Sequence, residues 1–189
     1  YLDLGDAAPI VFLDPPEHTQ FRRLISKGFT PRKANEMTQD ISSFVHCAID
    51  RIKDMENCDI ISELFKPLPS FVVSKYLGVP ESDRKIFDTW TERIVAGAVQ
   101  NENNTGLDAI AELTNYFTEM IEWRKKNPED DLISQLLEMG EEKVSIMWIL
   151  GLAFTMITGG NDTTTGLLGG SAVLLTDNQE QRKLLLKAL

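Results

Sequence analysis

Cysteine and histidine are scarce in this chain, and their scarcity excludes several kinds of site. The 189 residues include two cysteines, Cys47 and Cys58, and two histidines, His18 and His46. The cysteines stand apart, without a Cys-x-x-Cys pair or a Cys/His cluster, so the sequence predicts neither a zinc site nor a disulfide framework. Neither histidine follows a glutamate by three residues, as a di-iron helical oxygenase would require. Sparse cysteine fits a reducing compartment, and we expect a cytoplasmic protein.

Charge is almost absent from residues 144–176, where Asp162 is the one charged residue. The uncharged part is long enough to be considered as a membrane span. It ends, however, in the sequence TGGNDTTT, which is costly in hydrocarbon, so we expect a buried helix and no membrane span. A phosphate-binding glycine loop is excluded as well, because such loops need a lysine and no basic residue occurs between Lys143 and Arg182.

Basic residues are concentrated in one segment of an otherwise acidic chain. The net charge of −10 argues against general nucleic-acid binding. Residues 18–35 nevertheless carry five basic side chains and no acid, namely Arg22, Arg23, Lys27, Arg32 and Lys33. The segment is either a solvated helix face or a surface for a defined anionic partner or ligand.

Helical patterns cover nearly the whole chain, which predicts an all-α fold. We expect Asp14 and Thr30 to cap the first two helices, with Pro15 at the first helical position of one of them. A short extended piece is expected before a helix that ends at Gly78. Two further helices are separated by a polar loop over 100–106, which is either a mobile lid or only a loop. A short helix, the long helix over 144–176 and a final helix from 177 complete the prediction.

The stretch MITGGNDTTTGLLGG, residues 156–170, is unusual for the middle of a buried helix. Glycine and threonine are poor helix formers. Threonine hydroxyls can bond the carbonyl one turn back and bend the helix there. The stretch is therefore either a seam for close helix packing or a groove that receives a ligand. A buried carboxylate is costly alone, so Asp162 is expected to have a partner or a task.

Two separated motifs resemble the cytochrome P450 family, notably its soluble bacterial members. GGNDTT, residues 159–164, resembles the oxygen-activating helix of that family. FLDPPEHTQFRRLISKGFTPRK, residues 12–33, resembles the helix after its Asp-Pro-Pro-Glu-His turn. The motifs occur in the family's order, and so do the helices between them. The resemblance implies a mainly helical P450 fold around a long central helix, with residues 1–189 forming a partial P450 domain.

The resemblance also implies roles for single residues. His18 and Arg22 match the pair that binds the propionates of haem b (iron-protoporphyrin IX), and i, i+4 spacing puts them on one helix face. Gly159 and Gly160 match the small pair that lets haem and dioxygen approach. Asp162 and Thr163 match the acid–alcohol pair that, with ordered water, delivers protons to dioxygen. Thr164 matches the hydroxyl that follows.

Substrate and partner contacts are implied less directly. Ala153, Phe154 and Ile157 are expected near a substrate pocket. Arg23 and Lys27 are expected on the side where a redox partner docks, and they would steer an acidic ferredoxin or flavodoxin.

The family pattern is incomplete in this sequence. No Glu-x-x-Arg helix and no Phe-x-x-Gly-x-x-x-Cys loop occur, and both ends look cut from a longer chain. We expect apolar surface to be exposed where a missing half would pack. The sequence thus predicts a segment of a haem-thiolate monooxygenase that hydroxylates a hydrophobic small molecule with dioxygen and two electrons, inactive without the missing cysteine. The alternative is a non-catalytic helical module that binds haem, lipid or another protein.

Overall fold

The computed structural model describes residues 9–100 and 103–188, and these residues form helices and turns without a strand. The all-α prediction is confirmed. Among the described helices, none is long and apolar enough to cross a membrane. The elements are η2 (Ile10–Phe12), α1 (Glu17–Ile25), η3 (Ser26–Gly28), α2 (Pro31–Glu36), α3 (Thr38–Lys53), η4 (Ile61–Phe65), α4 (Pro67–Leu77), η5 (Glu81–Asp83), α5 (Arg84–Gln100), α6 (Asn103–Lys126), α7 (Leu132–Leu137), α8 (Ile146–Asp177) and α9 (Gln179–Ala188).

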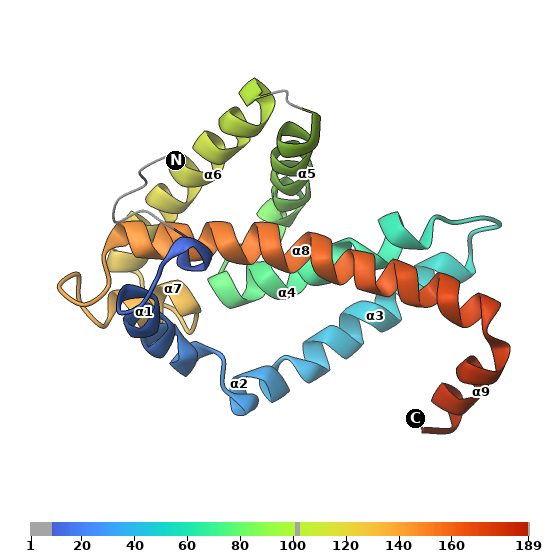
Figure 1. Ribbon diagram of the computed structural model, residues 1–189. Helices are drawn as coiled ribbons and strands as arrows, with labels where there is room; N and C mark the ends of the chain where they lie inside the picture. Colours follow the sequence, from blue (N-terminus) through green and yellow to red (C-terminus); the bar gives the residue numbers. More distant parts are fainter. Residues whose placement is uncertain (1–8, 101–102, 189) are drawn as a thin grey trace.

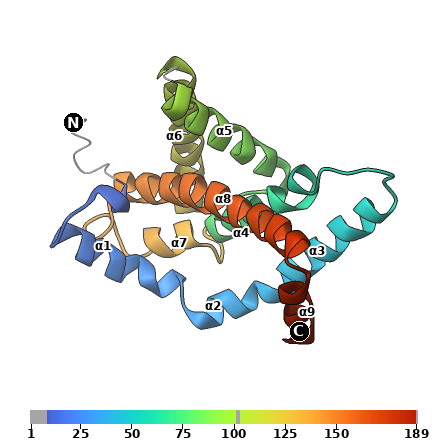
Figure 2. The same ribbon diagram turned by 45° about the vertical axis from the view of Figure 1, so that its right-hand side comes forward.

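The long helix α8 crosses the whole molecule, and the other helices are arranged around it (Figure 1). Helices α5 and α6 form a hairpin on one side of α8, and the arm made of α1, α2 and α3 lies on the other side (Figure 2). Helix α4 packs directly on α8 and contacts α3 and α5 as well. Helix α8 therefore lies between the α5–α6 hairpin and the arm of α1, α2 and α3, and the residues at its middle lie between these two parts (Figure 2).

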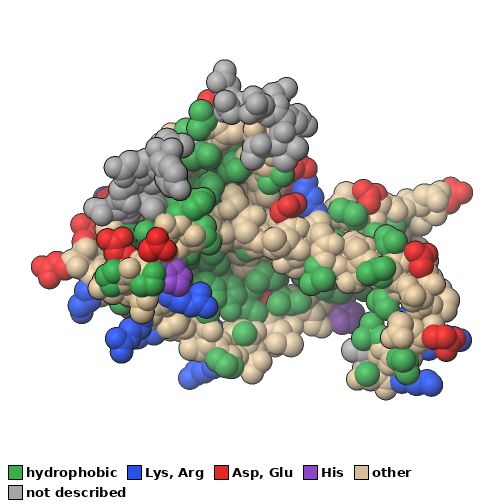
Figure 3. Space-filling view, in the orientation of Figure 1, with side chains coloured by type: hydrophobic (Ala, Val, Ile, Leu, Met, Phe, Trp, Pro, Cys, Tyr) green, Lys and Arg blue, Asp and Glu red, His purple; other side chains and the backbone are tan. Residues whose placement is uncertain are grey.

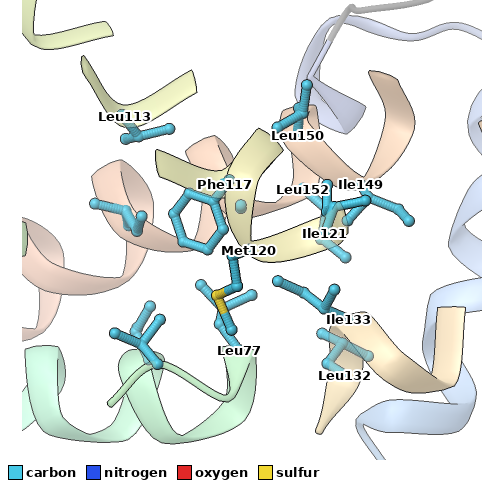
Figure 4. Packing of buried hydrophobic residues seen from close by; sticks show 14 of the residues in the cluster. Leu77, Leu113, Phe117, Met120, Ile121, Leu132, Ile133, Ile149, Leu150 and Leu152 are labelled. Carbon is cyan, nitrogen blue, oxygen red and sulfur yellow. The ribbon is translucent and has the colours of Figure 1, made fainter. Parts of the chain in front are cut away.

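The first half of α8 belongs to the hydrophobic core. Ile149, Ala153 and Ile157 are at most 1% exposed. Side chains of α4, α6 and α7 meet this part of α8 in one cluster, including Leu77, Phe117 and Ile133 (Figure 4). Burial of such side chains contributes roughly 1.5–3 kcal/mol each. The apolar sequence of this half-helix is thus explained by its place inside the molecule, as expected.

Several helix boundaries differ from the sequence prediction. Thr30 caps α2 as predicted, because its hydroxyl accepts a hydrogen bond from the Lys33 amide at 3.3 Å. The predicted cap at Asp14 is wrong, since α1 begins at Glu17 after Pro16 and has no side-chain cap. The predicted extended piece before α4 is a π-helical turn. Helix α6 begins at Asn103, so most of the predicted polar loop is helical, and residues 101–102 lie outside the description.

A buried ion pair fastens the end of α4 to α6 and α7. Gly78 ends α4 in the left-handed conformation, with φ +76°, as the stop signal predicted. Arg124 of α6 donates a hydrogen bond to the Gly78 carbonyl at 2.8 Å, and its Nε lies 2.7 Å from Asp131 Oδ2. The Asp131 side chain also caps α7 by accepting from the Ser134 amide at 2.7 Å. Burial raises the pKa of the Asp131 carboxyl, although Ser134 and Arg124 act in the opposite direction.

Apolar side chains are exposed along the second half of α8 and along α9, as expected. Leu167, Val173 and Leu174 are each more than 60% exposed, and three consecutive leucines of α9, at 184–186, are exposed as well. These residues follow the glycine and threonine stretch. Helix α8 therefore changes from a core helix to a surface helix along its length.

Substituting Gly78→Ala should destabilise the protein more than Gly140→Ala. Both glycines have positive φ, so both substitutions carry a left-handed strain of about 1–2 kcal/mol. At Gly78 a new Cβ would also lie 2.7 Å from Asp131 Cβ and displace that residue from Arg124, whereas nothing lies within 4 Å at Gly140. Urea unfolding should show a loss at position 78 that exceeds the loss at 140 by about 2 kcal/mol or more. Equal losses would contradict the proposed role of the ion pair.

Candidate functional site

The glycine and threonine stretch has an open face and a packed face. At Gly159 an added Cβ would meet no atom within 4 Å. At Gly160 it would lie 3.0 Å from Val73 Cγ2 of α4, which is tighter than ordinary contact. Gly160 therefore allows α8 to approach α4, whereas Gly159 leaves space on the other side. A packing seam is therefore present at Gly160, and the neighbouring Gly159 has an open face.

Threonine hydroxyls in this stretch bond the carbonyl groups one turn back, as predicted. Thr163 donates to the Gly159 carbonyl at 2.5 Å, and Thr158 donates to the Phe154 carbonyl at 2.8 Å. Thr165 donates to the Asn161 carbonyl at 2.8 Å. Each hydroxyl proton is thereby used within the helix. The oxygen of the exposed Thr163 keeps its free lone pairs for a donor outside.

The two polar neighbours in the middle of this stretch have opposite environments. Asp162 is exposed and forms no hydrogen bond or ion pair with any residue the structure describes. The expectation that Asp162 is buried is therefore wrong, and of the partner or task expected for it, no partner is present among the described residues. Asn161 is the buried polar residue instead, 3% exposed. Its Nδ2 donates to Thr91 Oγ1 at 3.3 Å, and its Oδ1 has no partner among the described residues. Asn161 carries no distinctive sequence signal, and the sequence prediction missed it.

The three predicted substrate-pocket residues face the core. Ala153 and Ile157 are fully buried in the core cluster, and Phe154 packs against it, half-buried. The geometry gives no support to a substrate contact at Ala153 or Ile157. Helical i, i+4 spacing puts the half-buried Thr155 and Thr158 on the faces of Gly159 and Asp162 respectively, and neither threonine lines one of the described cavities.

The first motif, residues 12–33, includes the whole of α1, and α1 packs against the start of α8. Phe21 is fully buried, and its ring lies 4.6 Å from the ring of Trp148 in the first turn of α8. His18 is half-buried and Arg22 is exposed, and their side chains form no hydrogen bond or ion pair within the described part of the chain. Both side chains are therefore free to bind an anionic group.

An apolar cavity brings the two motifs together. Its volume is about 460 Å³, and it opens between α3, α4 and α8. Phe29, which follows η3 in the first motif, lines it together with Gly160 and Thr164 of the second. The space-filling view shows this hollow below α8, with hydrophobic side chains inside it and Lys or Arg side chains gathered at its left edge over α1 (Figure 3). Residues far apart in sequence thus border one apolar space.

The basic segment divides into a paired part and an unpaired part. Arg32 pairs with Glu36 at 3.1 Å, and Lys33 pairs with Asp130 at 3.0 Å. Arg22, Arg23 and Lys27 form no ion pair with the residues that the structure describes. The unpaired positive charge is therefore confined to α1 and η3.

The described residues hold no cluster of His, Cys, Asp and Glu that could bind a metal ion. Cys47 and Cys58 are free and exposed. Cys47 lines a separate surface groove of about 1200 Å³ between α3, α4 and α6, and Cys58 lies in the turn after α3. Neither cysteine lines the apolar cavity.

Comparisons with known proteins agree with both motifs. No family model matches the chain. Cytochrome P450 130 of Mycobacterium tuberculosis is 46% identical over 190 residues, which cover 98% of this chain and 47% of that protein. Cytochrome P450 CYP107DY1 of Priestia megaterium is 32% identical over 176 residues, covering 92% of this chain and 43% of that protein. The chain thus spans about half the length of the curated relatives it matches.

Solved structures give the same result for the fold. The structure of CYP109E1 from Bacillus megaterium in complex with testosterone matches with a TM-score of 0.85 and 30% identity, over 93% of this chain and 48% of that one. P450BioI, in complex with an acyl carrier protein ligated to hexadec-9Z-enoic acid, matches with a TM-score of 0.85 and 29% identity, over 93% and 46%. Sequence and fold together place this chain in the cytochrome P450 family.

Proposed function

We propose that this chain is the oxygen-activating segment of a haem-thiolate monooxygenase, with residues 1–189 forming part of one P450 domain. The observation that carries the proposal is the arrangement on α8. Gly159 leaves an open face, Thr163 is bonded to the Gly159 carbonyl, and the exposed carboxylate of Asp162 stands beside them. In a member of the cytochrome P450 family, these residues would act together in oxygen activation.

The residues present fit a flat cofactor that carries carboxylates. Gly159 offers backbone without a side chain, and the cavity beside Gly160 is apolar. Arg22 and His18 have no described partner and would hold the haem propionates, Arg22 by paired N–H donors. When bound, haem b supplies the activation of dioxygen with two electrons. The thiolate ligand of the iron would have to come from beyond the described residues around this cavity.

The proposed proton delivery uses the carboxylate of Asp162 and the hydroxyl of Thr163, which are adjacent in sequence. The Asp162 carboxylate is exposed, so it can exchange protons with solvent. The hydroxyl of Thr163 is oriented by the Gly159 carbonyl, and its oxygen can accept a hydrogen bond from a water molecule. A proton held at Asp162 would then move through that water to the open face at Gly159. Such positioned acid–base groups contribute about 10²–10⁴-fold to a rate.

A hydrophobic small molecule is the proposed substrate. The apolar lining of the cavity supports this, and so do the relatives solved with testosterone and with a fatty acyl group. An acidic ferredoxin or flavodoxin is the proposed electron donor, since Arg23 and Lys27 are unpaired cations on α1 and η3. Two exposed free thiols fit the cytoplasm as the proposed location.

A non-catalytic module that binds haem or lipid is the alternative, because neither cysteine lines the cavity. A carbon-monoxide difference spectrum of the reduced, haem-loaded complete enzyme separates the two functions. A thiolate-type Soret band supports the monooxygenase. A band typical of nitrogen ligation, or no haem uptake, supports the alternative.

In the complete enzyme, substituting Thr163→Val should uncouple oxygen consumption from product formation. The substitution keeps the shape of the side chain but removes the hydroxyl that orients water, so product per electron should fall by about tenfold while hydrogen peroxide rises. Thr176→Val is the matched control, because Thr176 is also exposed on α8 and donates to the carbonyl one turn back at 2.7 Å. Equal coupling in the two variants would remove Thr163 from the mechanism.

In the complete enzyme, reversing the charges of Arg23 and Lys27 to Glu should slow reduction by the donor protein. Loss of steering should lower the association rate by about tenfold at low salt and flatten its dependence on ionic strength. The control reverses Lys85 and Lys187, which make the same change of net charge at exposed sites on α5 and α9. Stopped-flow reduction across a salt series measures the effect. A similar slowing in the control would show that only net charge matters.

A further inference from the structure

A second cavity, on the α5 side of α8, differs in chemistry from the apolar one. Its volume is about 590 Å³. It is bounded by η4, the start of α4, and the facing sides of α5 and α8. The residues that line it are Ile61, Lys66, Asp88, Thr91, Glu92, Val95, Ala96, Asn161, Asp162 and Thr165.

The hydrogen-bond donors around this cavity are used inside the protein. Thr91 donates its hydroxyl proton to the Phe87 carbonyl at 2.9 Å, and Thr165 donates to the Asn161 carbonyl at 2.8 Å. The side-chain amide of Asn161 donates to Thr91 Oγ1 at 3.3 Å. Lys66 is the single cation in the lining, and it is paired with Glu92. Among the described lining residues, the donor capacity left for a ligand lies mainly on the N–H groups of Lys66 that its pairing with Glu92 does not use.

Acceptors, in contrast, are in excess. The Oδ1 atom of Asn161 is buried and has no partner in the described residues, although the residue is only 3% exposed. A buried acceptor without a donor costs about 1–3 kcal/mol. Asp162 contributes a carboxylate with no described partner, and Asp88 accepts one hydrogen bond, from Ser70. The excess of acceptors therefore favours a molecule that donates hydrogen bonds.

We propose that this cavity binds a cationic amine, with its ammonium group on Asn161 Oδ1 and the Asp88 and Asp162 carboxylates and its carbon body against Ile61, Val95 and Ala96. Three carboxylates face one lysine in the lining, so an anion is repelled and a cation is attracted. An ammonium group offers three donors where the cavity offers acceptors. The volume lies within the range of small-molecule sites.

The electrostatic environment of the Asp88 carboxyl agrees with a cation bound in this cavity. Burial raises the pKa of its carboxyl, while the hydrogen bond from Ser70 and the charge of Lys66 lower it in part. A second cation beside Asp88 would compensate the loss of solvation. Asp162 belongs both to this cavity and to the acid–alcohol pair, so a bound amine would lie next to the reacting face. That consequence rests on the proposed function, whereas the binding itself does not.

Isothermal titration with cyclohexylamine hydrochloride near neutral pH tests the site, with cyclohexanol as the neutral comparison. The protein should bind one equivalent of the amine, more tightly than the alcohol and more weakly as salt rises. Asp88→Asn and Asn161→Leu should each weaken binding by about tenfold, since each removes one charge-assisted contact. Asp177→Asn, at the exposed end of α8, should leave the affinity unchanged. Unfolding curves confirm that each variant is folded.

Three results would overturn the site: no saturable amine binding, equal binding of cyclohexanol, or equal affinity in all four proteins. Amine that instead ligates a haem iron would shift the haem absorption band equally in every variant, which also overturns the proposal. The titration involves no turnover. A complete enzyme that binds the amine but makes no product would therefore defeat the proposed function and leave this site standing. A complete enzyme that makes product but does not bind the amine would defeat this site and leave the proposed function standing.

Discussion

The close approach of α8 to α4 at Gly160 and Val73 is the contact on which the rest of the arrangement depends. Interiors are packed densely enough that one added methyl group shifts its neighbours. A Cβ at position 160 would lie 3.0 Å from Val73 Cγ2, so α8 or the Val73 side chain would have to shift by a few tenths of an ångström, and both residues line the apolar cavity. The seam fixes α8 along α4, and this position then determines which residues of the glycine and threonine stretch are free.

The elements of the fold could be predicted from sequence where the signal was local. Thr30 caps a helix because a hydroxyl there satisfies an unpaired amide, and Gly78 ends one because it tolerates a left-handed backbone. Predictions failed where contacts with other elements determine the local structure. A short extended piece was predicted before the helix that ends at Gly78, yet residues 61–65 there form a turn of π-helix that packs against α3, α4 and α8.

Predictions for the candidate site likewise succeeded for local features and failed for features that depend on tertiary contacts. The motifs identified Thr163 and its hydrogen bond one turn back, because that bond lies within one helix. Burial of Asn161 rather than Asp162 depends on where α5 meets α8, and the residue pattern of α8 alone does not contain it. Likewise, an all-apolar half-helix does not indicate which of its residues face a cavity, so Ala153 and Ile157 could not be distinguished from core residues.

The change of α8 from core helix to surface helix has a consequence for its local stability. Opening a helical turn exposes much apolar surface near Ile149 and Ile157, but less beyond Thr163, where the side chains are already exposed or half-buried. Local opening therefore costs far more free energy in the first half than in the second. Asp162 and Thr163 lie at the boundary between these two halves of α8, with a stable helix before them and a helix that opens more easily after them.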